Sequence, residues 1–128
     1  MNDLISQMAN EAQHKASDPV ICAWVSASAG SGKTKVLTDR LLRLLLNKVE
    51  PEKILCLTFT KTAAAEMSNR LSGILQKWSV CSNEQLLSSL KKLLGNDFKE
   101  ETLTTARQLF ARVLDVRGGL NIMTIHSF

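Results

Sequence analysis

A run of eight small and polar residues that ends in Gly-Lys-Thr separates two strongly apolar segments of this 128-residue chain. Residues 20–26, before the run, are almost continuously apolar, which predicts a buried strand of a parallel sheet. Residues 33–47, after it, predict an amphipathic helix. The expected inner face of that helix consists of Leu37, Leu41, Leu44 and Leu45. A strand, a small-residue loop and a helix in this order predict an α/β fold with a phosphate-binding loop at the junction.

The loop itself consists of Ala27, Ser28, Ala29, Gly30, Ser31, Gly32, Lys33 and Thr34. Gly30 and Gly32 allow positive φ, so consecutive backbone N–H groups can point toward one anion. A helix beginning near Lys33 adds the partial positive charge of its N-terminus. We therefore expect all eight residues to bind ATP, with Lys33 on the β- and γ-phosphates and the Thr34 hydroxyl on Mg²⁺. Lys33 and Thr34 are the catalytic candidates, and the alternative is an ordinary glycine-containing turn.

Further helices and strands are predicted along the rest of the chain. Residues 3–16 form a weak amphipathic helix that Asp18-Pro19 ends. The later elements are a strand at 54–59, a helix at 63–78 capped by Thr60 or Thr62, a helix opened by Ser82 and ended by Gly95, a helix at about 99–116, and a strand at 120–125. This order predicts one domain, an α/β parallel sheet with a helical insertion at about 79–117.

Composition and cysteine content bound the class of protein. The net charge of +4 is compatible with a polyanionic partner but is too small to identify one. The cysteines are Cys22, Cys56 and Cys81, an odd number without a Cys-x-x-Cys pair, which favours buried free thiols in a reducing compartment. The N-terminus does not have the pattern of a signal peptide, and no apolar run is long enough to span a membrane. We therefore expect a cytoplasmic protein without a membrane partner.

Three sequence blocks in order resemble one helicase family. They are the loop at 27–34, the Thr-Phe-Thr-containing block at 57–67 and the Thr-Ile-His block at 124–128. Together they resemble motifs I, Ia and Ic of superfamily 1 DNA helicases of the UvrD/Rep/RecB type, a family that accepts alanine at the position of Ala27. The finer resemblance is to the alphaproteobacterial form of the AddA group of helicase–nuclease subunits. The resemblance covers essentially the whole chain and implies part of a RecA-like P-loop NTPase fold.

The resemblance also implies roles for residues outside the loop. Gln13 lies where the family has its Q motif, so its side-chain amide is expected to read adenine with a paired donor and acceptor. The alternative for Gln13 is a solvated residue on a helix surface. The residues expected to contact single-stranded DNA are Phe59, Thr60, Lys61, Thr124 and His126. An aromatic ring such as that of Phe59 stacks on bases, and lysine meets phosphate. The alternatives are a core position for Phe59 and a structural role for His126.

ATP hydrolysis needs groups that these blocks do not supply. An acidic residue must hold Mg²⁺, another group must orient water, and an arginine must stabilise the transferring phosphoryl. Residues 109–115 end in Asp115, but their helical spacing argues against an acidic strand. In the family, the acidic motif follows the Thr-Ile-His block, so we expect it, the second motor domain and the nuclease domain to lie beyond Phe128.

The sequence is therefore interpreted as the N-terminal fragment of an ATP-dependent DNA helicase of double-strand break repair. The parent would act on single- or double-stranded DNA together with a second, AddB-like subunit. The fragment alone is expected to bind ATP weakly and not to unwind DNA. Two alternatives stay open: a non-catalytic remnant of a broken helicase gene, and a different P-loop enzyme such as a small-molecule kinase.

Overall fold

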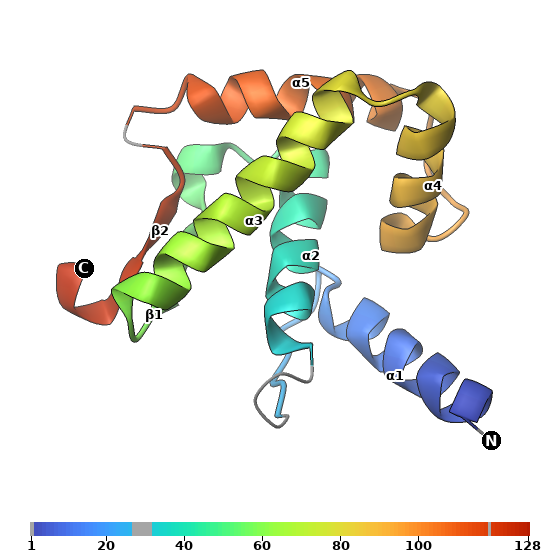
Figure 1. Ribbon diagram of the computed structural model, residues 1–128, viewed down its shortest axis with the longest axis horizontal. Helices are drawn as coiled ribbons and strands as arrows, with labels where there is room; N and C mark the ends of the chain where they lie inside the picture. The colour runs from blue at the N-terminus through green and yellow to red at the C-terminus, as the bar shows by residue number, and fades with distance from the viewer. Residues whose placement is uncertain (1, 27–31, 118) are drawn as a thin grey trace.

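The computed structural model describes residues 2–26, 32–117 and 119–128 (Figure 1). In chain order the elements are α1 (Asn2–Ala16), α2 (Lys33–Leu46), the 3-10 turn η1 (Pro51–Lys53), β1 (Leu55–Thr58), α3 (Lys61–Val80), α4 (Asn83–Leu94), α5 (Glu101–Leu114), β2 (Asn121–Thr124) and the 3-10 turn η2 (Ile125–Ser127). Strands β1 and β2 pair in parallel, from Leu55 opposite Asn121 to Thr58 opposite Thr124. The predicted α/β class and the parallel direction of these strands are confirmed.

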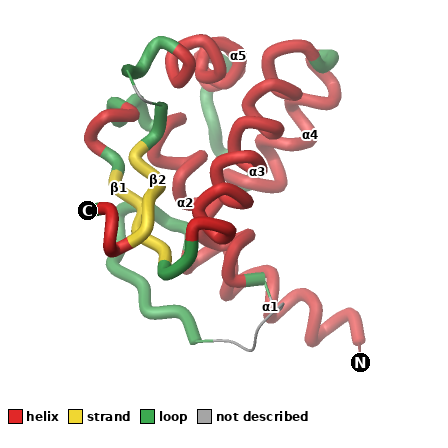
Figure 2. The backbone as a smooth tube through the Cα atoms, turned by 60° about the vertical axis from the view of Figure 1, so that its left-hand side comes forward, coloured by secondary structure: helices red, strands yellow, loops and turns green. Residues whose placement is uncertain are grey.

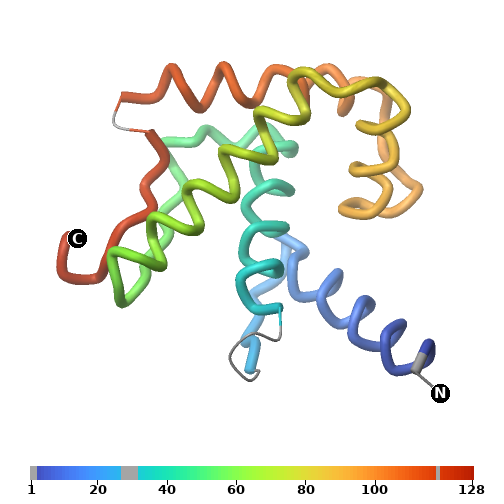
Figure 3. Tube along the Cα trace, in the orientation of Figure 1, coloured from blue at the N-terminus to red at the C-terminus, as the bar shows by residue number. Residues whose placement is uncertain are grey.

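One apolar core joins α2, α3, α4 and α5. In Figures 1 and 3, α3 runs diagonally past α2 and α5 passes above both. The side chains with 0% exposure are Leu45, Leu71, Leu75, Leu86, Leu90, Ala106 and Leu109, and they come from all four helices. Residues 79–117 therefore contribute to the common core through α4 and α5, and their identity as an insertion stays a prediction.

The helix ends follow their local sequence signals. Of the two threonines proposed as the cap of α3, Thr60 has the extended backbone of an N-cap, and its hydroxyl accepts the Ala63 N–H at 3.0 Å. The Ser82 hydroxyl accepts the Gln85 N–H at 3.3 Å at the start of α4. Gly95 ends α4 with a φ of 82°, which only glycine adopts readily. These three predictions depend on contacts within a few residues and are confirmed.

The strand predicted at 20–26 does not form. Its residues are a turn followed by irregular backbone, with Val20 86% and Trp24 95% exposed. A strand requires neighbours for its N–H and C=O groups. Strands β1 and β2 pair with each other, and among the described residues no backbone hydrogen bond joins 22–26 to either strand. Cys22 is consequently exposed rather than buried, whereas Cys56 and Cys81 are half-buried.

Helix α2 is buried on a broader face than predicted. Leu41 and Leu45 are buried as expected, but Leu37 is 47% exposed, and Leu42 and Leu46 are buried in its place. The reason is that α2 contacts helices on several sides: α3, α4 and α5 along its later turns and α1 nearer its start (Figure 3). A single leucine stripe does not describe a helix with that many neighbours.

Two further expectations concern acidic strands and membranes. Leu109 and Leu114 lie in α5 and Asp115 is its C-cap, so residues 109–115 are helical and not an acidic strand. None of the helices in the described ranges has both the length and the apolar character needed to cross a bilayer.

Candidate nucleotide site and strand-end surface

The first turn of α2 carries the described part of the predicted phosphate loop. Gly32 is the N-cap of α2 with φ 96° and ψ 11°, a left-handed conformation, and its carbonyl accepts the Val36 N–H at 3.1 Å. Lys33 and Thr34 follow on the first turn and are exposed. The first turn of α2 contains no acidic residue, so the positive end of its dipole is not offset by a carboxylate. The predicted residues Ala27, Ser28, Ala29, Gly30 and Ser31 lie outside the described residues.

Gln13 of α1 lies directly against this turn. A Cβ atom added to Gly32 would lie 2.5 Å from Gln13 Nε2, closer than two such atoms approach. Glycine at position 32 therefore makes room for the glutamine side chain as well as allowing the positive φ. A cavity of about 400 Å³ opens beside this contact. Its lining includes Ala12 and Gln13 from α1, Trp24 and Val25 from the following segment, and Gly32 and Lys33.

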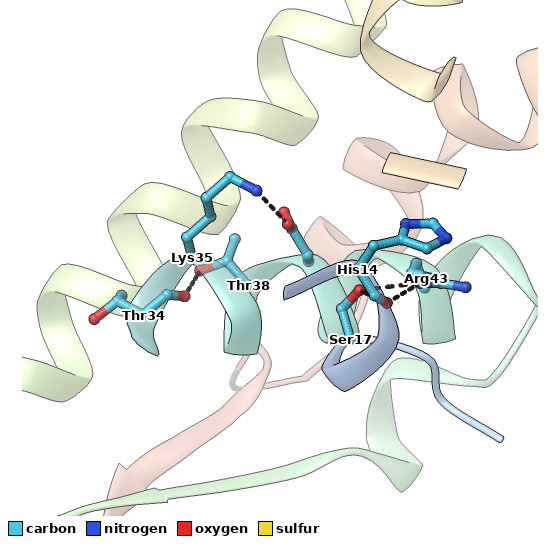
Figure 4. Close-up of polar contacts among 7 residues, drawn as sticks. His14, Ser17, Thr34, Lys35, Thr38 and Arg43 are labelled. Atoms are coloured by element: carbon cyan, nitrogen blue, oxygen red, sulfur yellow. Dashed lines mark hydrogen bonds and ion pairs between the residues drawn. The ribbon is translucent and has the colours of Figure 1, made fainter. Parts of the chain in front are cut away.

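Two arginines of α2 hold the C-terminal end of α1. Arg40 donates from Nη1 to the carbonyls of Ala16 at 3.2 Å and Asp18 at 2.9 Å, and from Nη2 to the carbonyl of Ile21 at 2.5 Å. Arg43 Nη1 donates to the His14 carbonyl at 2.9 Å and to Ser17 Oγ at 3.0 Å (Figure 4).

These acceptors are the carbonyls that a helix leaves without partners at its C-terminus, where the dipole is negative. Ser17 is 1% exposed and donates in turn to the His14 carbonyl at 2.8 Å. The end of α1 is therefore bound to α2 through charged hydrogen bonds.

The second group of predicted residues lies where β1 and β2 end. Because the strands are parallel and Thr58 lies opposite Thr124, the segments that follow them leave the sheet at the same edge (Figure 2). Phe59 is 84% exposed there, and Lys61 and His126 are also exposed. The alternative of a core position for Phe59 is therefore wrong for this structure. We call Phe59, Lys61 and His126 the strand-end surface.

The two predicted threonines at this edge differ in exposure. Thr60 is exposed, and its hydroxyl accepts the Ala63 N–H while keeping its own proton to donate. Thr124 is 7% exposed, and its hydroxyl lies 2.8 Å from the Ser127 hydroxyl within the turn η2. The Thr58 hydroxyl donates to the Thr60 carbonyl at 3.0 Å. The backbone of the edge is thus shaped by short hydroxyl contacts.

The sequence was compared with known proteins. The family model described as UvrD/REP helicase N-terminal domain matches residues 8–128. This chain belongs to the UvrD/REP helicase family. It is 35% identical over 107 residues to the AddA protein, the ATP-dependent helicase/nuclease subunit, of Clostridium botulinum strain Alaska E43, and 36% identical to that of strain Loch Maree. The Clostridium beijerinckii protein of the same name is 35% identical.

Each of these alignments covers 81% of this chain but only 7% of the relative. The chain therefore spans about 7% of the length of the relatives it matches. No solved structure matches the chain. The predicted membership in the UvrD-like helicases, and the likeness to helicase–nuclease subunits, are confirmed.

Sequence reasoning within this UvrD/REP helicase chain missed Arg40, Arg43 and Ser17. The arginines act on carbonyls 19 to 29 positions earlier in the chain, so no local pattern identifies them. A usable signal was present nonetheless: Arg40 and Arg43 are one turn apart on α2, on a helix that follows the phosphate loop.

Burial changes one thiol near the strand-end surface. Cys56 lies on the face of β1 that packs against the core, and burial raises the pKa of its thiol. Its thiolate is therefore disfavoured at neutral pH, and it is poorly suited to act as a nucleophile or metal ligand there.

Proposed function

We propose that this chain supplies the N-terminal part of the motor of an ATP-dependent DNA helicase, binding MgATP at the start of α2 and single-stranded DNA at the strand-end surface. The observation that carries the proposal is the placement of Gln13 against Gly32, beside Lys33 and Thr34. A residue proposed to read the base and residues proposed to bind the phosphates come from separate elements and meet at one point.

The described residues fit a magnesium-bound triphosphate. Lys33 and Thr34 stand at the positive end of α2, with no carboxylate in that turn. Lys33 would meet the terminal phosphates and the Thr34 hydroxyl would ligate Mg²⁺, in agreement with the preference of Mg²⁺ for oxygen ligands. The loop residues 27–31 would add backbone N–H groups. The bound metal would neutralise phosphate charge.

The strand-end surface suits a flexible single strand. Phe59 offers an exposed ring for base stacking, which contributes roughly 1–3 kcal/mol per base. Lys61 would neutralise a phosphate, and the free proton of the Thr60 hydroxyl is available to another. His126 completes the surface from η2, and Thr124 supports that turn from beneath. Both sites would then lie within one motor domain.

The remaining functional statements concern the longer parent protein. We propose that the acidic residues and arginine that break the phosphate bond belong to parts of the parent outside this chain, which spans about 7% of its relatives' length. The relatives are named as one subunit of a helicase/nuclease, which supports a second, different protein chain as partner. Double-strand break repair in the cytoplasm is the role proposed for the whole assembly.

Nucleotide titration tests the proposal. Calorimetry or NMR with the full chain should detect saturable, Mg²⁺-dependent ATP binding with a dissociation constant of about 0.1–1 mM, since only part of a site is present. Lys33→Ala should abolish binding. Lys35→Ala is the matched control, because Lys35 is on the same turn but pairs with Asp39 at 2.8 Å. Equal effects of both changes, or no binding together with a molten spectrum, would contradict the proposal and favour a remnant.

A second titration separates a helicase from another P-loop enzyme. Lys61→Ala and Phe59→Ala should each weaken binding of a short oligothymidylate, and the salt dependence of binding should fall in the lysine variant. Lys77→Ala is the control, since it lies exposed near the other end of α3. Binding that responds equally to Lys61→Ala and Lys77→Ala would favour non-specific attraction to a basic protein.

A further inference from the structure

We propose that Arg40 and Arg43 are positioning residues that set the base preference of the nucleotide site by fixing Gln13. The inference rests on the proposed function, because it assigns a role within the same ATP site. Neither arginine touches the cavity side of Gln13, and both act through the backbone at the end of α1 (Figure 4).

The position of α1 depends strongly on these two side chains. The large apolar residues of α1, Leu4, Ile5 and Met8, are each 61–62% exposed, so apolar burial contributes little to its docking. By contrast, the carbonyls of His14, Ala16 and Asp18 all accept from Arg40 or Arg43. Figures 1 and 3 show α1 leaving the helical core and contacting it only near its C-terminal end. The arginine contacts therefore fix the direction in which α1 leaves α2.

Gln13 belongs to the same turn of α1 that the arginines hold. Its carbonyl accepts the Ser17 N–H at 3.0 Å, and Ser17 is the residue whose hydroxyl accepts from Arg43. Rotation or fraying of this turn would move the Gln13 amide away from Gly32 and from the adjoining cavity. A paired amide contact to a base edge requires both donor and acceptor in register, so such a movement removes discrimination.

The phosphate-binding groups have a different support. Lys33 and Thr34 are part of α2 itself, and the Thr34 carbonyl accepts from the Thr38 hydroxyl at 2.8 Å (Figure 4). Thr38 is 2% exposed, so this turn is fixed by α2 and its core contacts and not by α1. Base recognition and phosphate binding should consequently separate when the arginines are removed.

Arginine is required at these positions by its shape. One guanidinium group of Arg40 reaches three carbonyls with two nitrogens, which a lysine ammonium on a single stem does not reproduce. Arg40→Lys keeps the charge and should still lose most of the effect. Arg43→Lys should keep more of it, because Arg43 uses a single nitrogen.

The experiment measures the affinities of the full chain for three probes: MgATP, MgCTP and magnesium tripolyphosphate. The variants are Arg40→Ala/Arg43→Ala, Gln13→Ala, the triple variant, and Arg70→Ala as a control arginine exposed on α3. The wild type should prefer ATP over CTP, and the double arginine variant should lose roughly tenfold of that preference. Its tripolyphosphate affinity should stay within about twofold of the wild type, because α2 is unchanged.

Additional outcomes decide the inference. Gln13→Ala should cause the same loss of preference, and the triple variant should lose no more, because the residues act as one unit. Amide hydrogen exchange at residues 13–17 should be faster in the arginine variant, while the core helices stay protected. An unchanged ATP-to-CTP ratio, or a parallel loss of tripolyphosphate binding, would overturn the inference alone. Tripolyphosphate binding that is absent or insensitive to Lys33→Ala would overturn the proposed function and this inference together.

Discussion

Helices α3, α4 and α5 contact α2 through fully buried leucines, whereas α1 contacts it through arginine side chains and exposed backbone carbonyls. The first contact is non-directional and depends on buried area. The second is directional and depends on where individual atoms lie. The core thus supports the first turn of α2, while the neighbouring base-reading residue is held by a separate polar device. The experiments below break or sharpen this difference, beginning with the largest expected effect.

Removing a core leucine should have the largest effect. Leu71 of α3 is 0% exposed, and Leu71→Ala should lower the free energy of unfolding by about 2–5 kcal/mol through lost burial and a residual cavity. Urea denaturation followed by circular dichroism measures the change.

Two controls place that loss on the core side of α2. Leu114→Ala, 67% exposed on α5, and Leu4→Ala, 61% exposed on α1, should each stay within about 0.5 kcal/mol of the wild type. A cost for Leu4→Ala comparable to that of Leu71→Ala would mean that α1 is packed like the core helices.

Adding a methyl group to two glycines should change stability in opposite directions. Gly95 has φ 82° and ψ −164°, a region that is costly for other residues, so Gly95→Ala should destabilise by about 1–3 kcal/mol although the space around it is open. Gly73 lies inside α3 with no atom near its missing Cβ, so Gly73→Ala should stabilise by about 0.5–1 kcal/mol. Thermal unfolding of both variants gives the signs, and equal signs would contradict this explanation of how α4 ends.

Removing the cap of α4 should have an intermediate effect. Ser82→Ala deletes the acceptor of the Gln85 N–H and should cost about 1 kcal/mol. Ser88→Ala, on the exposed surface of the same helix, is the matched control and should change stability little. Amide exchange at Gln85 should accelerate in the first variant only. If both serines behave alike, the hydroxyl of Ser82 is not acting as a cap.

The smallest effect concerns pH. Because burial raises the pKa of the Cys56 thiol, the folded state retains that proton at a pH where the unfolded chain has released it. The contribution should be fully present below about pH 8.5, the ordinary thiol pKa, and should decline as the pH rises through the folded-state value. Denaturation midpoints of Cys56→Ala should lack this decline. Alkylation should also reach the exposed Cys22 first, and earlier modification of Cys56 would contradict its burial.

Much of the fold could be predicted because its signals are local. The caps at Thr60 and Ser82 and the glycine at position 95 act within one helical turn, and the α3 stripe from Met67 to Trp78 repeats at helical spacing. The failure at residues 20–26 has the opposite cause. An apolar run becomes a strand only beside another strand, and the partner is not a property of the run itself.

The candidate sites divide in the same way. The start of α2 and the common edge after β1 and β2 follow from motif order and parallel strand direction. The closeness of Gln13 to Gly32 was expected only from the family resemblance, and Arg40 and Arg43 were not expected at all. Contacts that join positions far apart in the sequence, through backbone carbonyls of any residue type, leave no compositional trace.

Residue-resolved hydrogen exchange, with and without MgATP, tests most directly the claim that the nucleotide binds where α1 meets α2. We expect slower exchange at residues 13–17 and 32–38 in the presence of MgATP, and unchanged exchange in α4 and α5. The protection should disappear in Lys33→Ala and persist in Lys35→Ala. Protection that appears in α4 as strongly as at the first turn of α2, or no protection at residues 32–38 under saturating MgATP, would contradict the claim.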